Sequence, residues 1–193
     1  MVNKKKKSLV YPAVFMLVLA AVLTFLLAML NEQTKPIVAK NAEFELRKKI
    51  LYVFSIENDG TQNDVDNKFT TNVKETDKKY NNKPIFEYEK DGKKAYAVSL
   101  QGPGLWGPIE AYVALSEDYN TILGIDFIKQ SETPGLGGRI EEPFYKEQYR
   151  NIGSKDVFKK VDFISGATMT SLSVARLVSG DLAKFVKTMG GSN

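Results

Sequence analysis

The residues best suited to chemistry lie together between Asp162 and Ser171, in the segment Asp-Phe-Ile-Ser-Gly-Ala-Thr-Met-Thr-Ser. Small and hydroxyl side chains dominate this segment, and an amphipathic helical pattern follows it. The first turn of a helix leaves backbone N–H groups without acceptors at the positive end of the helix dipole, which favours phosphate. A threonine hydroxyl at such a place, here Thr168, can cap the helix or carry a phosphoryl group. Because serine and threonine are common helix caps, the pattern by itself favours the cap.

Two glycine-rich loops are the other candidates for a site. Residues 102–108 contain Trp106, the single tryptophan of the chain, and residues 133–138 include three glycines and a proline. Glycine permits unusual backbone angles and a close approach to a flat ligand. By composition alone the second loop would be an ordinary surface turn, and a lone tryptophan would be a packing residue. An indole ring could also stack on an aromatic ligand.

Three of these segments together resemble the FMN-binding domain family. Asp-x-x-Ser-Gly-Ala-Thr at 162–168 is similar to the flavinylation motif, in which a flavin transferase joins the FMN phosphate to the last threonine as a phosphoester. Residues 132–138 resemble a loop of the NqrC component of the Na+-translocating NADH:quinone oxidoreductase (Nqr) and of the RnfG component of the related Rnf complex. Gly-Leu-Trp-Gly at 104–107 resembles a segment of NqrC. The segments occur in the family's order, and the resemblance is weakest between residues 58 and 84.

The resemblance implies that FMN is attached covalently to Thr168. The residues expected beside it are Ser165, Gly166, Ala167, Thr170 and Ser171 at the phosphate end, and Thr133, Gly135, Leu136 and Trp106 at the ring end. The small side chains of Gly166 and Ala167 leave the threonine hydroxyl accessible, and the neighbouring hydroxyls can donate hydrogen bonds to phosphate. Asp162 is expected to help recognition by the transferase or to shape the turn, and Glu132 is given no proton-transfer role.

Composition excludes several other kinds of chemistry. The 193 residues include no cysteine and no histidine, which removes disulfides, Fe–S ligation, cysteine-based zinc sites and the usual base at neutral pH. No metal site is expected, and redox chemistry would need an organic cofactor. Four lysines at residues 4–7 account for the whole net charge of +4, so the basic pI does not indicate a nucleic-acid surface. No Rossmann fingerprint is present, so NADH binding is not expected.

An uncharged apolar run at residues 9–30 is long enough to cross a bilayer as a helix. The alternative is a cleaved signal peptide, which usually has a shorter apolar core and a small-residue cleavage site. No such cleavage site is evident after Leu30, so a retained anchor is favoured. The lysines before the run predict a cytoplasmic N-terminus, with the flavin domain on the outer side of the cell (inner) membrane.

The remaining chain predicts an α+β fold, an antiparallel sheet with flanking helices. Helices are predicted at 36–54, with Pro36 in the first turn, at 141–149, and at 171–188, where Gly190-Gly191 would end the helix. Two hairpins are predicted, 85–88 with 95–100 around Asp91-Gly92, and 109–115 with 122–128 around residues 117–120. Residues 58–82 are expected to be loops, with at most a short helix near 68–73.

The expected organisation is a basic N-terminus at 1–8, a transmembrane helix at 9–30, a helical and loop connection at 31–84, and an FMN-binding domain at 85–193. The corresponding function is electron relay in an Nqr- or Rnf-type membrane complex that couples NADH-linked redox to Na+ or H+ translocation. Expected partners are the other membrane and flavin or Fe–S subunits, and the flavin transferase. Two alternatives remain: a stand-alone membrane-anchored FMN reductase or regulatory domain, and a cofactor-free, membrane-tethered binding module.

Overall fold

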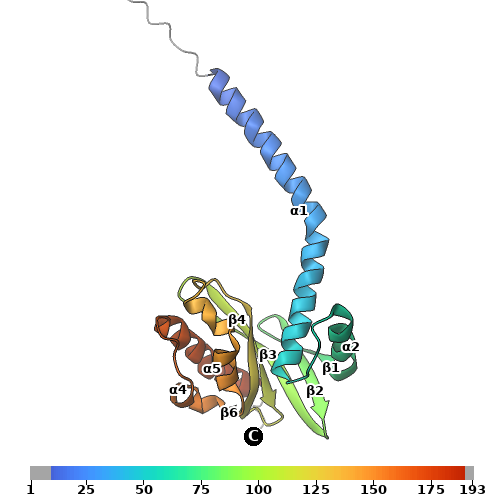
Figure 1. The fold of residues 1–193 in the computed structure, drawn as a ribbon, viewed down its shortest axis with the longest axis vertical. Helices are drawn as coiled ribbons and strands as arrows, with labels where there is room; N and C mark the ends of the chain where they lie inside the picture. The colour runs from blue at the N-terminus through green and yellow to red at the C-terminus, as the bar shows by residue number, and fades with distance from the viewer. Residues whose placement is uncertain (1–9, 190–193) are drawn as a thin grey trace, which may run out of the picture. The chain divides into compact units, whose positions relative to one another are not determined.

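The structure is a computed structural model that describes residues 10–189 (Figure 1). The chain divides into two compact units, residues 1–43 and residues 44–193. The predictions that rest on the lysines at 4–7 and on Gly190-Gly191 lie outside the described residues.

Helix α1 (Val10–Val53) is continuous and carries the apolar run. Its most apolar window has a mean hydropathy of 2.8, and it is the one helix within residues 10–189 that is long and apolar enough to cross a membrane. The prediction that Pro36 begins a new helix was wrong, because Pro36 lies inside α1. The carbonyl of Glu32, which loses its donor at Pro36, lies on an exposed part of the helix where water can replace the missing N–H.

Within residues 10–189, six strands form one sheet in sequential order, and every neighbouring pair is antiparallel. The strands are β1 (Val73–Tyr80), β2 (Lys83–Lys90), β3 (Lys93–Pro103), β4 (Pro108–Ser116), β5 (Thr121–Lys129) and β6 (Ile152–Gly153). The two predicted hairpins are β2–β3 and β4–β5. Asp91 and Gly92, between β2 and β3, both have positive φ angles, 53° and 73°, as the favoured two-residue hairpin turn requires. The predicted α+β class is therefore confirmed.

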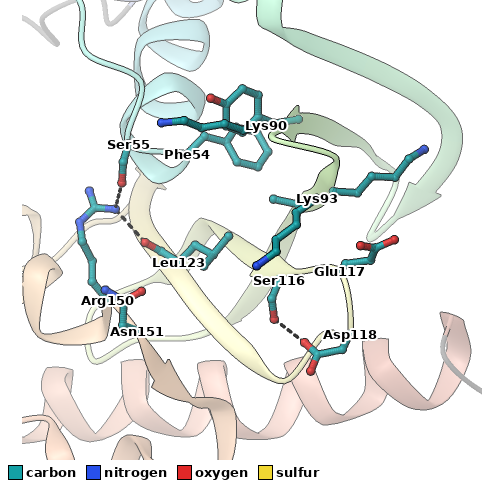
Figure 2. A pocket seen from close by; sticks show the side chains of 13 residues that line it. Phe54, Ser55, Lys90, Lys93, Ser116, Glu117, Asp118, Leu123, Arg150 and Asn151 are labelled. Carbon is teal, nitrogen blue, oxygen red and sulfur yellow. Dashed lines mark hydrogen bonds between the residues drawn. The ribbon is translucent and has the colours of Figure 1, made fainter.

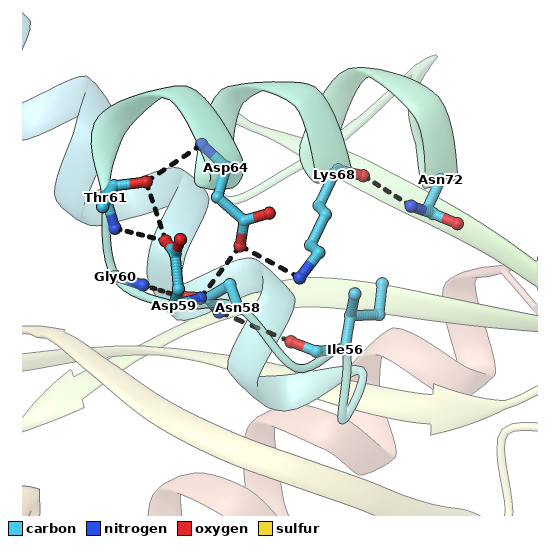
Figure 3. Close-up of polar contacts among 8 residues, drawn as sticks. All are labelled: Ile56, Asn58, Asp59, Gly60, Thr61, Asp64, Lys68 and Asn72. Atoms are coloured by element: carbon cyan, nitrogen blue, oxygen red, sulfur yellow. Dashed lines mark hydrogen bonds and ion pairs between the residues drawn. The ribbon is translucent and has the colours of Figure 1, made fainter.

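Residues 58–82 are more ordered than the loops predicted for them. Helix α2 (Gln62–Asn72) begins after Thr61, whose side-chain oxygen accepts a hydrogen bond from the N–H of Asp64 (3.3 Å), and Asp64 in turn accepts one from the N–H of Asp59 (2.9 Å; Figure 3). Lys68 pairs with Asp64 one turn later, at 2.9 Å. Strand β1 follows as an edge strand whose side chains are mostly exposed. Both elements bury few apolar residues, so the apolar periodicity that marks the other elements is missing here.

Helices cover both faces of the sheet (Figure 1). The side chains of β3 alternate between two cores: Val98 and Leu100 pack with helix α5 (Thr168–Met189), whereas Ala95 and Ala97 pack with the end of α1 and with α2. Between β5 and α5 the chain forms η1 (Gly137–Glu141), α3 (Pro143–Lys146), η2 (Glu147–Tyr149), strand β6, η3 (Ser154–Asp156) and α4 (Val157–Lys160). The predicted helix at 141–149 is thus replaced by two short pieces, α3 and η2, that follow the end of η1.

Candidate functional site

A pocket of about 270 Å³ brings together the three segments that the sequence analysis selected. The β3–β4 loop contributes Leu105 and Trp106, the loop after β5 contributes Glu132, Thr133, Leu136 and Gly137, and the start of α5 contributes Gly166, Ala167, Thr168, Met169 and Thr170. Seven of the ten predicted site residues therefore line one pocket. The other three, Ser165, Gly135 and Ser171, are not among its lining residues.

Thr168 is the first residue of α5, three residues before the predicted start of that helix. Its side chain is exposed, and the residue before it is Ala167, whose methyl group cannot accept a hydrogen bond. Alanine is among the poorest N-cap residues, so no side chain at that position satisfies the first N–H groups of the helix. An N-cap residue precedes the first turn of its helix, whereas Thr168 lies in the first turn of α5. Thr168 is therefore not the N-cap of this helix. The arrangement leaves an exposed hydroxyl and helix-start N–H donors at the same place.

Ser171 is fully buried, and its hydroxyl serves the turn before the helix. Its Oγ accepts a hydrogen bond from the N–H of Ile164 at 3.0 Å and donates one to the carbonyl of Ala167 at 3.1 Å. Beneath it, Tyr145 approaches the Ser171 carbonyl and contacts the hydroxyl of Tyr149 at 3.0 Å. Burial raises the pKa of Tyr145, so this phenol remains neutral at physiological pH. Ser171 therefore holds the turn to α5 and does not face the pocket.

Four residues that line the pocket were not among the predicted site residues: Leu105, Glu132, Gly137 and Met169. Glu132 is the one of these four that carries a charged side chain. Its side chain is buried, yet its carboxylate accepts hydrogen bonds from two different segments. Oε1 accepts from the N–H groups of Leu105 (2.8 Å) and Trp106 (3.1 Å), and Oε2 accepts from the hydroxyl of Thr170 (2.6 Å). These partners lie 26 to 38 residues away in the chain. The sequence feature that could have indicated this role is a single acidic residue directly before a glycine-rich loop.

The rim of the pocket is unusually apolar for an exposed surface. Leu105, Trp106, Leu136 and Met169 line it, and between 47% and 68% of each residue is exposed. Apolar side chains gathered around a pocket are typical of a ligand site, since isolated exposed apolar residues would be scattered. Trp106 is the most exposed of the four, which differs from the buried packing role expected of a lone tryptophan.

These features fit FMN. The uncapped start of α5 offers N–H donors to a phosphate, Thr168 offers a hydroxyl beside them, and the apolar rim suits a flat aromatic ring. Among residues 10–189 no group of three or more histidine, cysteine, aspartate or glutamate residues could hold a metal ion. An organic ligand that carries a phosphate group would fit these features.

A larger pocket, of about 680 Å³, lies elsewhere in the same unit (Figure 2). Several of its polar side chains already form hydrogen bonds or ion pairs with other residues of the chain. Arg150 donates to the Ser55 hydroxyl and to the Leu123 carbonyl, both at 2.8 Å, and Lys94 pairs with Glu87 at 2.9 Å. None of the predicted site residues lines this pocket. Of these two pockets, the one at Thr168 combines an exposed hydroxyl at a helix start with an apolar surface for a ligand.

Residues 104–182 match the FMN-binding domain family, and this stretch includes Trp106, the loop at 133–138 and Thr168. The predicted resemblance is confirmed. Similar proteins include NqrC of the Na(+)-translocating NADH-quinone reductase from Vibrio anguillarum, 38% identical over 96 residues, which are 40% of this chain and 37% of that protein. The corresponding protein of Chlamydia trachomatis is 36% identical over 80 residues, 42% of this chain and 23% of that one. The matches thus span well under half the length of these relatives.

Solved structures extend the similarity over a larger part of the chain. The crystal structure of the Parabacteroides distasonis NqrC has a TM-score of 0.68 and 26% sequence identity, and the similarity covers 82% of this chain and 98% of that one. The Shewanella oneidensis NqrC structure has a TM-score of 0.64 at 22% identity, covering 80% and 100% of the two chains. The second likeness supports the fold alone.

Proposed function

We propose that this chain is a membrane-anchored electron-transfer subunit whose FMN is bound covalently, as a phosphoester, to Thr168. We further propose that it works in a complex of the Na+-translocating NADH-quinone reductase type. The observation that carries the proposal is the meeting of three distant segments around the exposed Thr168 hydroxyl. The names of the similar proteins support the type of complex.

Different residues of the pocket would bind the phosphate end and the ring end of FMN. The Thr168 oxygen would form the new bond to phosphorus as the bond from phosphorus to the leaving group of an activated flavin donor breaks. The N–H groups of the first turn of α5 would donate to the remaining phosphate oxygens. Trp106, Leu136 and Leu105 would cover the ring. FMN would supply the electron chemistry. Because the chain has no histidine to deprotonate Thr168, a separate flavin transferase would supply the base for attachment.

The direct test is to express the chain with a flavin transferase, denature it, wash it, and measure flavin absorbance. Flavin that survives denaturation and maps to the peptide containing Thr168 by mass spectrometry supports the proposal. A washed chain without flavin would favour the cofactor-free binding module. Recovery of the chain in mild detergent without other redox subunits would favour the stand-alone FMN domain, and the identity of co-purifying subunits distinguishes an Nqr-type from an Rnf-type complex.

A second prediction concerns the rim of the pocket. Trp106→Ala and Leu136→Ala should both retain covalent flavin, because attachment is at the phosphate end. They should raise flavin fluorescence and shift its absorption maxima towards those of free FMN, because the ring loses aromatic and apolar contacts worth about 0.5–1.5 kcal/mol.

Phe158→Ala is the matched control, since Phe158 is also exposed (50%) but does not line the pocket. Spectra that are equally unchanged in all three variants would show that these loops do not hold the ring. Trp106 would then have no role at the flavin.

A further inference from the structure

We propose that Glu132 is a positioning residue that ties the Trp106 loop to the first turn of α5 and so sets the ring side of the pocket before flavin is attached. The ligand named here rests on the proposed function, but the contacts that carry the inference are made within the protein itself.

The carboxylate of Glu132 connects parts of the chain that lie far apart in the sequence. Only 5% of the residue is exposed, and its two oxygens serve different segments. Oε1 accepts hydrogen bonds from the N–H groups of Leu105 and Trp106, with N···O distances of 2.8 and 3.1 Å. Oε2 accepts one from the hydroxyl of Thr170, with an O···O distance of 2.6 Å. Hydrogen bonds to an ionised acceptor are shorter and stronger than neutral ones, so this single side chain can fix both segments.

Two glycines make room for this carboxylate. A Cβ atom on Gly104 would lie 2.5 Å from Oε1 of Glu132, and one on Gly137 would lie 2.8 Å from Oε2 and 2.6 Å from the Thr170 hydroxyl oxygen. Real Cβ atoms essentially never approach so closely. The glycines that suggested close approach to a flat ligand therefore also allow a buried acid to reach across the pocket floor.

The Trp106 loop depends on Glu132 for its backbone order. The loop closes on itself with a bond from the N–H of Gly104 to the carbonyl of Gly107, at 2.8 Å. The next two N–H groups, those of Leu105 and Trp106, donate to Glu132. Without the carboxylate both donors lose their acceptor, while the exposed indole provides little packing to keep the loop in place.

Glutamine is a discriminating replacement for Glu132. Its amide oxygen can still accept from Leu105 and Trp106, and its NH₂ group can donate to the Thr170 hydroxyl, which accepts as well as donates. Glutamine thus keeps a hydrogen bond to each partner, with the direction of the bond to Thr170 reversed, while removing the charge. Alanine removes both. A positioning role predicts rescue by glutamine, whereas a role that needs the negative charge predicts loss in both variants.

The first measurement is amide hydrogen exchange at Leu105 and Trp106 in the full chain in detergent, in a Thr168→Ala background that carries no attached flavin. Glu132→Ala should accelerate exchange at these two amides by about tenfold or more, because each loses a charge-assisted hydrogen bond. Glu132→Gln should stay within about threefold of the parent, because a neutral bond replaces each charged one. Anisotropy of the single tryptophan should fall in the alanine variant. Glu141→Ala, which removes an exposed acid from the adjoining η1, is the control and should change neither quantity.

Thr170→Val keeps the test decisive if Glu132→Ala fails to fold. This variant removes the hydroxyl that donates a hydrogen bond to Oε2 of Glu132, while preserving the shape of the side chain. Amide exchange at Leu105 and Trp106 should therefore rise, but by less than in Glu132→Ala. Unchanged exchange in Thr170→Val and Glu132→Ala would overturn the proposal. So would a glutamine variant whose loop exchanges as fast as that of the alanine variant.

The second measurement uses the flavin-loaded chain with Thr168 intact. Glu132→Ala should keep its covalent label and emit more flavin fluorescence than the parent, because the Trp106 side of the pocket is no longer fixed. If no chain is labelled, the proposed function fails while the exchange result still decides the role of Glu132. If labelling succeeds and emission is unchanged in Glu132→Ala, the positioning role fails by itself.

Discussion

Thr168→Ala is expected to lose all covalent flavin, while the protein still folds and inserts. The variant removes the one oxygen that the proposed phosphoester requires, and the hydroxyls of Thr170 and Ser171 are not free to replace it. Thr170 and Ser171 are buried and donate to Glu132 and to the Ala167 carbonyl. Fluorescence of the denatured chain in a gel, divided by the amount of protein, should fall to background.

Folding should be preserved because the Thr168 side chain is exposed and alanine is the best helix former. Thr168→Ser keeps a hydroxyl and should be labelled in part. Thr188→Ala is the matched control at the other end of α5, where an exposed threonine bonds back to the Lys184 carbonyl at 2.9 Å, and it should be labelled fully. Flavin retained in Thr168→Ala, or mapped to Ser165, would show that attachment occurs elsewhere.

The parts of the fold that could be predicted are those where apolar periodicity and turn chemistry agree. Strands β2 to β5 carry the apolar residues of the two predicted hairpins, and Asp91-Gly92 adopts the positive φ angles that such a pair is known to favour. The same reasoning failed for α2 and β1. α2 buries only Val65, and its start depends on local side-chain hydrogen bonds that involve Thr61 and Asp64.

The site shows a similar division. Local signatures located a helix start and two glycine-rich loops, but by themselves they favoured an ordinary cap and an ordinary turn. The resemblance to the FMN-binding domain family selected these segments as one site. The start of α5 was placed three residues late, because its first turn has few apolar residues to mark it. The role of Glu132 could not be read at all. It depends on backbone N–H groups and a hydroxyl that only the folded chain brings within reach.

The second large effect is expected in the orientation of the chain across the membrane. The absence of native cysteine allows single cysteines to be introduced without background. Ala183→Cys places a thiol on an exposed position of α5, and Ser8→Cys places one next to the four lysines in the sequence. Lysines before a span are retained in the cytoplasm, so an impermeant maleimide added to cells stripped of their outer layers should label Ala183→Cys and leave Ser8→Cys unlabelled.

The same pair of variants provides its own control in open membranes. After permeabilisation both cysteines should react, which shows that the unlabelled one was protected by the bilayer and not by the protein. Labelling of Ser8→Cys alone in intact cells would show that the orientation is the opposite of the predicted one. Release of Ala183→Cys into the soluble fraction would indicate a cleaved signal peptide. Retention with outside labelling would place the Thr168 pocket on the outer face. Electrons from a cytoplasmic donor would then have to reach it through another protein of the proposed complex, because the chain has no cysteine or histidine to hold a metal cofactor in its span.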